Sequence, residues 1–198
     1  PEDVAKATTA DIIISGEADN VICDVVKDID TYKQKRIIFA GKVKDLDSLP
    51  LPARHLLDMT KYTSLPNNYR TSPYVFHVMT TRGCPYTCTF CGDAISGFRQ
   101  RSVENVMEEL KLLKRQYNIK EIAFWDDVFT LNKQWVYKFC EEMNKLDFRL
   151  VWSCYTRLDL VDEQLAKAMK EAGCWNIFFG IESGSDELLK NITKRMTV

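Results

Sequence analysis

The sequence lacks any long apolar run, any excess of charge of one sign, and any repeated or low-complexity segment. No hydrophobic stretch approaches the roughly 20 residues that a membrane-spanning helix requires. The 27 basic and 28 acidic residues give a formal net charge of −1, which argues against a surface that coats nucleic acid. With 45% hydrophobic residues over 198 positions, the composition is typical of a globular protein of one domain or slightly more.

The two ends of the sequence carry no recognisable start or targeting signal. PEDVAKATTA opens the chain without an initiator methionine and without the apolar core of a signal peptide. NITKRMTV closes it directly after the expected start of a helix. We therefore expect a fragment that is cut at both ends.

Cysteine, in contrast, is abundant and unevenly placed. Seven cysteines are present, and three of them, Cys84, Cys88 and Cys91, fall within eight residues. A secreted disulfide framework would spread its cysteines more evenly and would follow a signal peptide. The clustering favours a reduced metal or redox site in a cytoplasmic protein. The other four fall on apolar faces or in expected strands, where packing in the core is the simpler interpretation: Cys23, Cys140, Cys154 and Cys174.

The first part of the chain predicts two short strands, at 11–15 and 37–39, with a helix between them. Asn20 is placed to cap this helix. Its apolar face would be formed by Ile22, Val25, Val26 and Ile29. Residues 46–74 contain four prolines, which break long elements, so this stretch is predicted to be a linker.

The rest of the chain alternates between continuous apolar strands and amphipathic helices. Strands are expected at 74–79, 121–125, 149–155 and 174–181. One helix should begin near Lys133, and others should be capped by Ser102, Asp162 and Ser185. Continuous strands separated by helices predict a parallel sheet, either open and doubly wound or part of a barrel. The active surface should then lie at the carboxyl ends of the strands.

The first of these strands leads into TTRGCPYTCTFCGD, which carries a C-x3-C-x2-C array. Three thiolates on one loop can converge on an inorganic centre, and as soft ligands they suit iron–sulfur clusters or zinc. A structural zinc site needs a fourth ligand. The nearest candidates are poor, because His77 lies inside the expected strand and Asp93 is a hard carboxylate. A 4Fe–4S cluster with one open iron fits better.

RGCPYTCTFC, with Phe90 just before the last cysteine, resembles the signature of the radical S-adenosylmethionine (radical SAM) superfamily, particularly of members with a cobalamin-binding domain. The resemblance extends from about Thr80 to the end of the chain. It includes FWDDVFT (124–130), RLDLV (157–161) and GIESGSDELLKNITK (180–194). Upstream, ISGEADNV (14–21) and DLDSLPLPARHLLDM (45–59) resemble the tail of a cobalamin domain and its linker to the barrel.

This resemblance implies a domain organisation. Residues 75–198 would form the N-terminal part, about four βα units, of a (β/α)6 barrel of the radical SAM type. Residues 1–45 would be the C-terminal remnant of a Rossmann-like cobalamin-binding domain, in which Gly16 and Glu17 match positions near the lower face of cobalamin. Such a partial barrel would be poorly active and would expose an unpaired sheet edge after its fourth strand.

The resemblance also implies a mechanism that the thiolate spacing alone does not. The three cysteines would bind three irons of the cluster, and S-adenosylmethionine would chelate the fourth through its amino and carboxylate groups. One electron passed to the sulfonium would give methionine and a 5′-deoxyadenosyl radical, which abstracts a hydrogen atom from an unknown substrate. Flavodoxin or ferredoxin would supply the electron, and cobalamin would be a further cofactor of the full-length protein.

Several residues around the loop are implied to contact the cluster or the cofactor. Tyr86 and Phe90 would wall the cluster. The end of the second strand, Trp125, Asp126 and Asp127, would meet the amino group of the cofactor, although the two aspartates could instead cap the following helix.

Two further positions are implied to bind the rest of the cofactor. Arg157 would bind its carboxylate, with an ordinary ion pair as the alternative. Glu182 and Ser183 would bind ribose hydroxyls, with the start of the next helix as the alternative. The sequence identifies no catalytic residue.

Two other functions compete with a radical SAM enzyme of the cobalamin-dependent group, whose reactions include methylation and cyclisation. A tRNA methylthiotransferase has a similar cysteine loop but an additional cluster domain upstream, and residues 1–75 contain one cysteine, Cys23. A zinc or iron–sulfur binding module without enzymatic activity is the second alternative. Neither a membrane nor nucleic acid is an expected partner.

Overall fold

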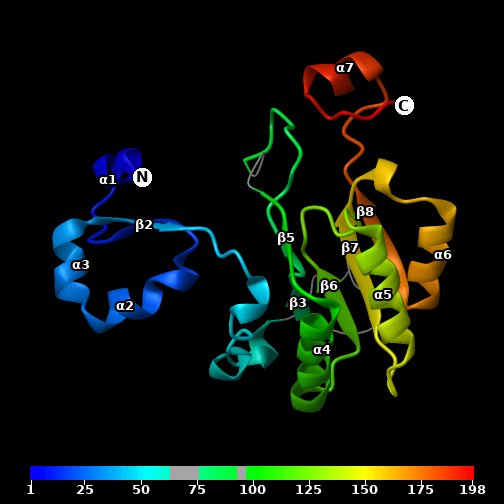
Figure 1. Ribbon diagram of the computed structural model, residues 1–198, viewed down its shortest axis with the longest axis horizontal. Coiled ribbons are helices and arrows are strands. Elements are labelled where there is room, and N and C mark those ends of the chain that lie inside the picture. The colour runs from blue at the N-terminus through cyan, green and yellow to red at the C-terminus, as the bar shows by residue number, and fades with distance from the viewer. Residues whose placement is uncertain (63–75, 93–96) are drawn as a thin grey trace. The chain divides into compact units, whose positions relative to one another are not determined.

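Figure 1 shows the computed structural model, which describes residues 1–62, 76–92 and 97–198. These residues divide into two compact units, Pro1–Leu49 and Pro50–Val198. Within the described ranges, no helix is both long and apolar enough to cross a membrane. The expected strand residues 74 and 75, and Asp93, lie outside the described residues.

The first unit contains a two-stranded parallel sheet, β1 (Ile13–Gly16) and β2 (Ile37–Gly41). Three short helices accompany it: α1 (Glu2–Ala7), α2 (Ile22–Lys27) and α3 (Ile29–Lys35). The strands approach closely at Gly16, where φ is +105° and a Cβ atom would lie 2.6 Å from the carbonyl oxygen of Gly41. The bounds of β1 and β2 overlap the strands predicted from the apolar runs at 11–15 and 37–39.

The helix between these strands differs from the prediction. Asn20 lies in a 3-10 turn (Ala18–Asn20) and Val21 occupies the N-cap of α2, so the predicted Asn20 cap is wrong. Asp28 divides the expected helix, because its carboxylate accepts a hydrogen bond from the Thr31 amide and starts α3. Of the expected apolar face, only Val25 is buried, while the exposed fractions reach 41%, 68% and 46% for Ile22, Val26 and Ile29.

The second unit is built on a four-stranded parallel sheet in the order β3 (Phe76–Val78), β6 (Glu121–Phe124), β7 (Val151–Thr156) and β8 (Cys174–Phe179). The predicted α/β class with a parallel sheet is confirmed. Every residue of β8 is partly exposed, and no described strand pairs with its outer edge, so the expected unpaired edge is present.

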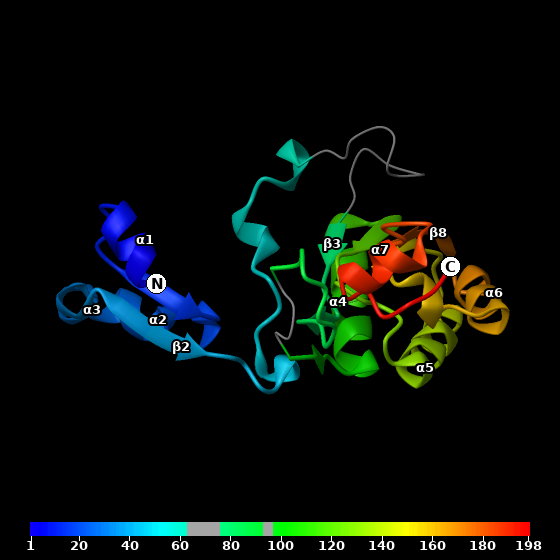
Figure 2. The same ribbon diagram turned by 90° about the horizontal axis from the view of Figure 1, so that it is seen from above.

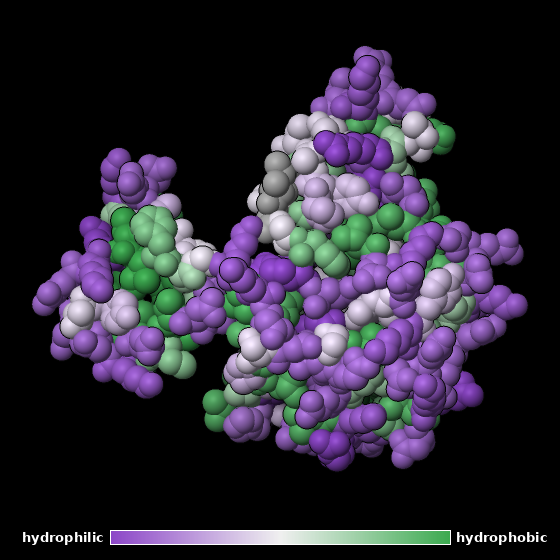
Figure 3. Space-filling view, in the orientation of Figure 1, coloured by the Kyte–Doolittle hydropathy of each residue, from purple (hydrophilic) through white to green (hydrophobic). Residues whose placement is uncertain are grey.

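Three helices connect these strands and cover one face of the sheet: α4 (Val103–Tyr117), α5 (Lys133–Asn144) and α6 (Glu163–Glu171). Figure 2 shows them side by side along that face, and in Figure 3 hydrophilic residues predominate on their outer surface. The caps predicted for α4 and α6 are confirmed, because Ser102 accepts from the Asn105 amide at 3.1 Å and Asp162 from the Leu165 amide at 2.8 Å. α7 (Asp186–Asn191) follows β8 and is capped by Ser185 as predicted.

The core lies between the sheet and these helices and is rich in aromatic rings. Phe124, Phe129, Phe139 and Trp152 are all fully buried. Their ring centroids lie 5.0–5.9 Å apart, mostly edge to face, which is a favourable arrangement for aromatic pairs. The packing therefore ties β6 and β7 to α5.

Residues 50–62 fold as two short 3-10 turns, Arg54–Leu56 and Met59–Lys61, in the described part of the predicted linker. Arg54 holds this stretch to the rest of the second unit. Its Nη1 lies 2.7 Å from Oε1 of the buried Glu109, and its Nη2 donates to the carbonyl oxygen of His77 at 2.9 Å. Arg101 pairs with the other oxygen of Glu109. Two arginines therefore neutralise one buried carboxylate, as a buried charge requires.

A small antiparallel pair, β4 (Thr81–Arg82) and β5 (Arg99–Gln100), was not predicted. It follows β3 and brings together the two ends of the segment that contains the cysteine array. Residues 83–92 of this segment are called the cysteine loop below. Its neck is thus closed by backbone hydrogen bonds at the carboxyl end of the sheet.

Candidate functional site

The three clustered cysteines line one cavity of about 360 Å³ at the carboxyl ends of the strands. Cys84 and Cys88 are buried, whereas Cys91 is exposed. The remaining walls come from the cysteine loop, from the ends of β7 and β8, and from the residues after β6 and α7. They include Tyr86, Phe90, Asp127, Tyr155, Arg157, Phe178, Glu182 and Lys194. The cavity therefore lies where the parallel sheet predicted the active surface.

The thiols are neighbours, but they do not form a closed site for a single ion. In the described ranges, no group of three histidine, cysteine, aspartate or glutamate side chains is arranged to hold one metal ion. Burial raises the pKa of the Cys84 thiol, and the nearby Asp127, Cys91 and Cys88 raise this pKa further. A cluster distributes its cysteine ligands over several irons. Three soft thiolate ligands on the wall of one cavity are chemically suited to an iron–sulfur cluster.

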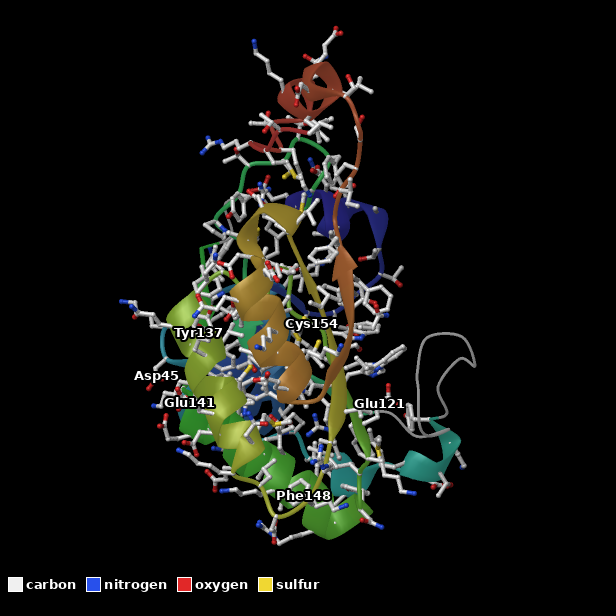
Figure 4. The ribbon with its side chains drawn as sticks, turned by 90° about the vertical axis from the view of Figure 1, so that its right-hand side faces the viewer. Asp45, Glu121, Tyr137, Glu141, Phe148 and Cys154 are labelled. Carbon is white, nitrogen blue, oxygen red and sulfur yellow. The ribbon has the colours of Figure 1, made fainter. Side chains whose placement is uncertain are left out.

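The other cysteines are mostly placed as expected. Cys140 and Cys154 are buried in the core, Cys154 on β7 as labelled in Figure 4, and Cys174 is partly buried. Cys23 is exposed, so its assignment to core packing is wrong. It lies two residues before the buried Val25 on α2, and positions two apart point to different sides of a helix.

Arg157 has protein partners at most of its donors. Its Nε and Nη2 donate to the two oxygens of Asp159 at 3.0 and 2.8 Å, and its Nη1 donates to the carbonyl oxygen of Lys194 at 2.8 Å. The guanidinium carbon lies 3.9 Å from the centroid of the Tyr86 ring. The structure therefore contains the expected ion pair, and Arg157 also lines the cavity.

Glu182 and Ser183 have different surroundings. Glu182 lines the cavity and accepts a hydrogen bond from Lys194 Nζ at 2.7 Å. The ion pair lies over Gly180, where a Cβ atom would be 2.8 Å from Glu182 Oε1 and 3.0 Å from Lys194 Nζ. Ser183 does not line the cavity, and its hydroxyl accepts from the Ser185 amide at 3.1 Å, at the start of α7.

The three residues after β6 are consecutive in sequence, but their side chains lie in different surroundings. Asp127 lines the cavity, whereas Trp125 and Asp126 do not. Trp125 is 52% exposed, and its ring centroid lies 4.5 Å from that of His77. Neither aspartate caps α5, because Asn132 is its N-cap, so the capping alternative is wrong.

Asp126 instead holds the neck of the cysteine loop. One carboxylate oxygen, Oδ1, accepts from the amide of Thr80 at 2.8 Å and from the hydroxyl of Thr81 at 2.6 Å. Oδ2 is buried without a hydrogen-bond partner among the described residues. Burial raises the pKa of Asp126 from 3.8 to about 6, against the lowering effect of the threonine hydrogen bonds. Asp126 therefore links the end of β6 to β4.

Two parts of the cavity were missed by sequence reasoning. Tyr155 and Phe178 pair across β7 and β8 and stack with their ring centroids 4.7 Å apart at 17°. They face away from the helices because they alternate along the strands with core-facing residues such as Cys154. The alternation of side chains along a strand could have predicted this orientation from the sequence. Lys194, whose side chain is 7% exposed, comes from a segment without strand or helix and carried no such signal.

Comparisons with known proteins bear on this site. The protein-family model described as the radical SAM superfamily matches residues 78–198 of this chain. PH0819 of Pyrococcus horikoshii, named as an uncharacterized methyltransferase, is 39% identical over 158 residues, which are 78% of this chain and 33% of that protein. The anaerobic magnesium-protoporphyrin IX monomethyl ester cyclase of Rubrivivax gelatinosus is 28% identical and covers 100% of this chain and 39% of its own length.

Among solved structures, the apo form of OxsB, a cobalamin-dependent S-adenosylmethionine radical enzyme, has a similar fold. The TM-score is 0.67 at 22% sequence identity, over 91% of this chain and 29% of that chain. The chain thus spans about a third of the length of these relatives.

Proposed function

The chain belongs to the radical SAM superfamily, and we propose that Cys84, Cys88 and Cys91 hold a 4Fe–4S cluster with which S-adenosylmethionine is cleaved reductively. The observation that carries the proposal is that all three cysteines line one cavity at the carboxyl end of the sheet. When bound, the cluster and S-adenosylmethionine supply the radical chemistry, and the protein supplies binding, orientation and exclusion of water.

The cavity walls suggest how the chain contributes. Tyr86 and Phe90 flank the cysteines, and the stacked pair Tyr155 and Phe178 offers a flat apolar wall. Glu182 carries a carboxylate that can accept hydrogen bonds from ribose hydroxyls once its pair with Lys194 opens. We give no cofactor contact to Trp125, Asp126 or Ser183, since they lie outside the walls.

For the reaction we propose cobalamin-dependent methylation, with cyclisation as the second candidate. PH0819 is named as a methyltransferase, the Rubrivivax protein as a cyclase, and OxsB as cobalamin-dependent. In this proposal residues 1–45 belong to a cobalamin-binding domain, 46–74 to a linker and 75–198 to the barrel. The higher identity to PH0819 favours methylation.

The proposed electron donor is a flavodoxin or ferredoxin, and the proposed location is the cytoplasm. Iron–sulfur cysteines must remain reduced until the cluster is built, which the cytoplasm favours. The substrate binds, in this proposal, on the open side of the cavity beyond S-adenosylmethionine. The relatives are enzymes by name, which counts against a binding module without activity.

Anaerobic reconstitution of the chain with iron and sulfide tests the cluster. We expect a brown, oxygen-sensitive protein with about four irons per chain. The variant with Cys84, Cys88 and Cys91 replaced by Ala should lose this absorbance, whereas Cys23→Ala, an exposed cysteine outside the loop, should keep it. A full cluster in the triple variant would refute the proposal.

The same measurement separates the alternatives. One zinc and no iron would support the binding module, as would the absence of S-adenosylmethionine cleavage with a reductant. A methylthiotransferase would require a second cluster in the longer protein, detected as about eight irons per chain.

A further inference from the structure

Residues 192–195, called the post-helix segment below, pack against the cysteine loop although they lie far from it in sequence. The amide of Thr89, between two of the clustered cysteines, donates to the carbonyl oxygen of Ile192 at 3.0 Å. Lys194 Nζ lies 5.9 Å from the ring centroid of Phe90. The backbone and the side chains of the loop are therefore both in contact with this segment.

Arg157 contacts both the cysteine loop and the post-helix segment. Its guanidinium stacks on Tyr86 of the cysteine loop, and its Nη1 donates to the Lys194 carbonyl of the post-helix segment. Two hydrogen bonds to Asp159 fix the plane of the guanidinium. A planar guanidinium can make these hydrogen bonds and contact the Tyr86 ring at the same time, which a lysine ammonium could not reproduce. The side chain is 4% exposed, so solvent does not compete for these contacts.

The backbone of the post-helix segment adopts an unfavourable conformation. Thr193 and Arg195 have φ angles of 56° and 55°, in the left-handed region that favours glycine. Such residues persist where surrounding contacts hold them, and they are frequent at functional sites. The Lys194 carbonyl that Arg157 binds lies between them. Arg157 is therefore placed to hold the segment in this conformation.

We propose that Arg157 is a positioning residue, which clamps Tyr86 and the post-helix segment together so that Cys84 and Cys88 stay buried along the cavity. This differs from the contact with the cofactor carboxylate that the sequence implied. The importance of the clamp for catalysis rests on the proposed function, because there the same cysteines bind the cluster. The existence of the clamp does not rest on the proposed function, and the clamp can be measured in the metal-free chain.

The test measures how fast the thiols of the metal-free, reduced chain react with 5,5′-dithiobis(2-nitrobenzoic acid). A Cys23→Ala background removes the exposed cysteine outside the loop. We expect Arg157→Gln to raise the rates of the buried loop thiols about tenfold, as loss of about 1.4 kcal/mol of closure would. Arg149→Gln is the control, because Arg149 is an exposed arginine just before β7 and outside the clamp.

A double-mutant cycle with Tyr86→Leu distinguishes positioning from general destabilisation. If the stacking matters, the effects of Arg157→Gln and Tyr86→Leu on the thiol rates are non-additive, and Arg157→Lys restores less than half of the protection. Deuterium exchange of the peptide containing Thr89 should accelerate in the same variants. If Arg157→Gln does not fold, Tyr86→Leu and Arg157→Lys carry the test alone.

Unchanged thiol rates and unchanged exchange at Thr89 in the folded variants would overturn the clamp. That result would leave the proposed function intact if the chain still bound its iron. Conversely, failure of the wild-type chain to bind iron would refute the proposed function, while faster thiols in the variants would still establish the clamp. In the reconstituted chain, we further expect Arg157→Gln to change the electron paramagnetic resonance spectrum of the reduced cluster.

Discussion

In the second unit, the core between the sheet and the helices and the site at the carboxyl ends of the strands are held together by different interactions. Between the sheet and the helices, packing of fully buried rings such as Phe124, Phe139 and Trp152 dominates. At the carboxyl ends of the strands, ion pairs and hydrogen bonds join the segments: the Arg157–Asp159 and Lys194–Glu182 pairs and the carboxylate of Asp126. Apolar packing fixes the scaffold, whereas directional contacts shape a cavity that must stay open.

The largest effect should come from the core. Trp152→Ala removes a fully buried ring that also donates from Nε1 to the Ala172 carbonyl at 2.9 Å. We expect the free energy of unfolding to fall by about 3–5 kcal/mol, as for other buried aromatic residues. Urea denaturation followed by circular dichroism measures it. A loss below 1 kcal/mol would contradict the assignment of stability to this layer.

Gly173 offers the next test on the core side. It has a φ of +95°, and a Cβ atom would lie 2.4 Å from the carbonyl oxygen of Leu150. Because that atom belongs to the backbone and cannot move aside, Gly173→Ala should cost about 2–3 kcal/mol of unfolding free energy. The same denaturation experiment gives the value, and a neutral effect would show that the turn after α6 can shift.

Asp126 should make stability at the neck depend on pH. Its pKa is raised from 3.8 to about 6 in the folded state, so the folded chain binds the proton more tightly than the unfolded chain. Its contribution therefore favours folding at low pH and declines as the pH rises between about 4 and 6, by roughly 3 kcal/mol in total.

Asp126→Asn removes this titration. We expect the difference in unfolding free energy between variant and wild type to change with pH between 4 and 6 and to be constant above 7. Thr130→Val, a buried hydroxyl elsewhere in the unit, serves as a control without a titratable group. A difference that does not vary with pH would refute the raised pKa.

The smallest effect on stability is expected at Gly180, on the rim. A Cβ atom there would meet only the tips of the Glu182 and Lys194 side chains, which can move. Gly180→Ala should cost less than about 1 kcal/mol but displace the ion pair. Equilibrium dialysis of S-adenosylmethionine against the reconstituted variant should show several-fold weaker binding. A stability loss as large as that of Gly173→Ala would remove the contrast between the two layers.

The core was predictable from sequence for a physical reason. Helix caps such as Ser102 and Asp162 act on residues three positions away, and apolar periodicity reports burial directly. The Asn20 cap is wrong because Asn20 ends a 3-10 turn and α2 begins one residue after Val21, while the side-chain cap in this region is that of Asp28 on α3.

The site was predictable only in part. The cysteine array is local, and its three members indeed line one cavity. Tyr86 and Lys194, which contact Arg157, lie in distant segments of irregular backbone, where no periodicity in the sequence indicates which residues are in contact. Trp125, Asp126 and Asp127 were grouped because they are adjacent in sequence, yet neighbouring residues at a strand end point to opposite sides.

The open edge of β8 has a consequence for how this chain behaves in solution. One side of its backbone presents hydrogen-bonding groups that no described strand pairs, and an unpaired strand can recruit another chain as its neighbour. Trp175, Ile177 and Phe179 are partly exposed on this strand, which contains no lysine to discourage such pairing. At rising concentration, this edge can serve as a template on which further copies of the chain assemble.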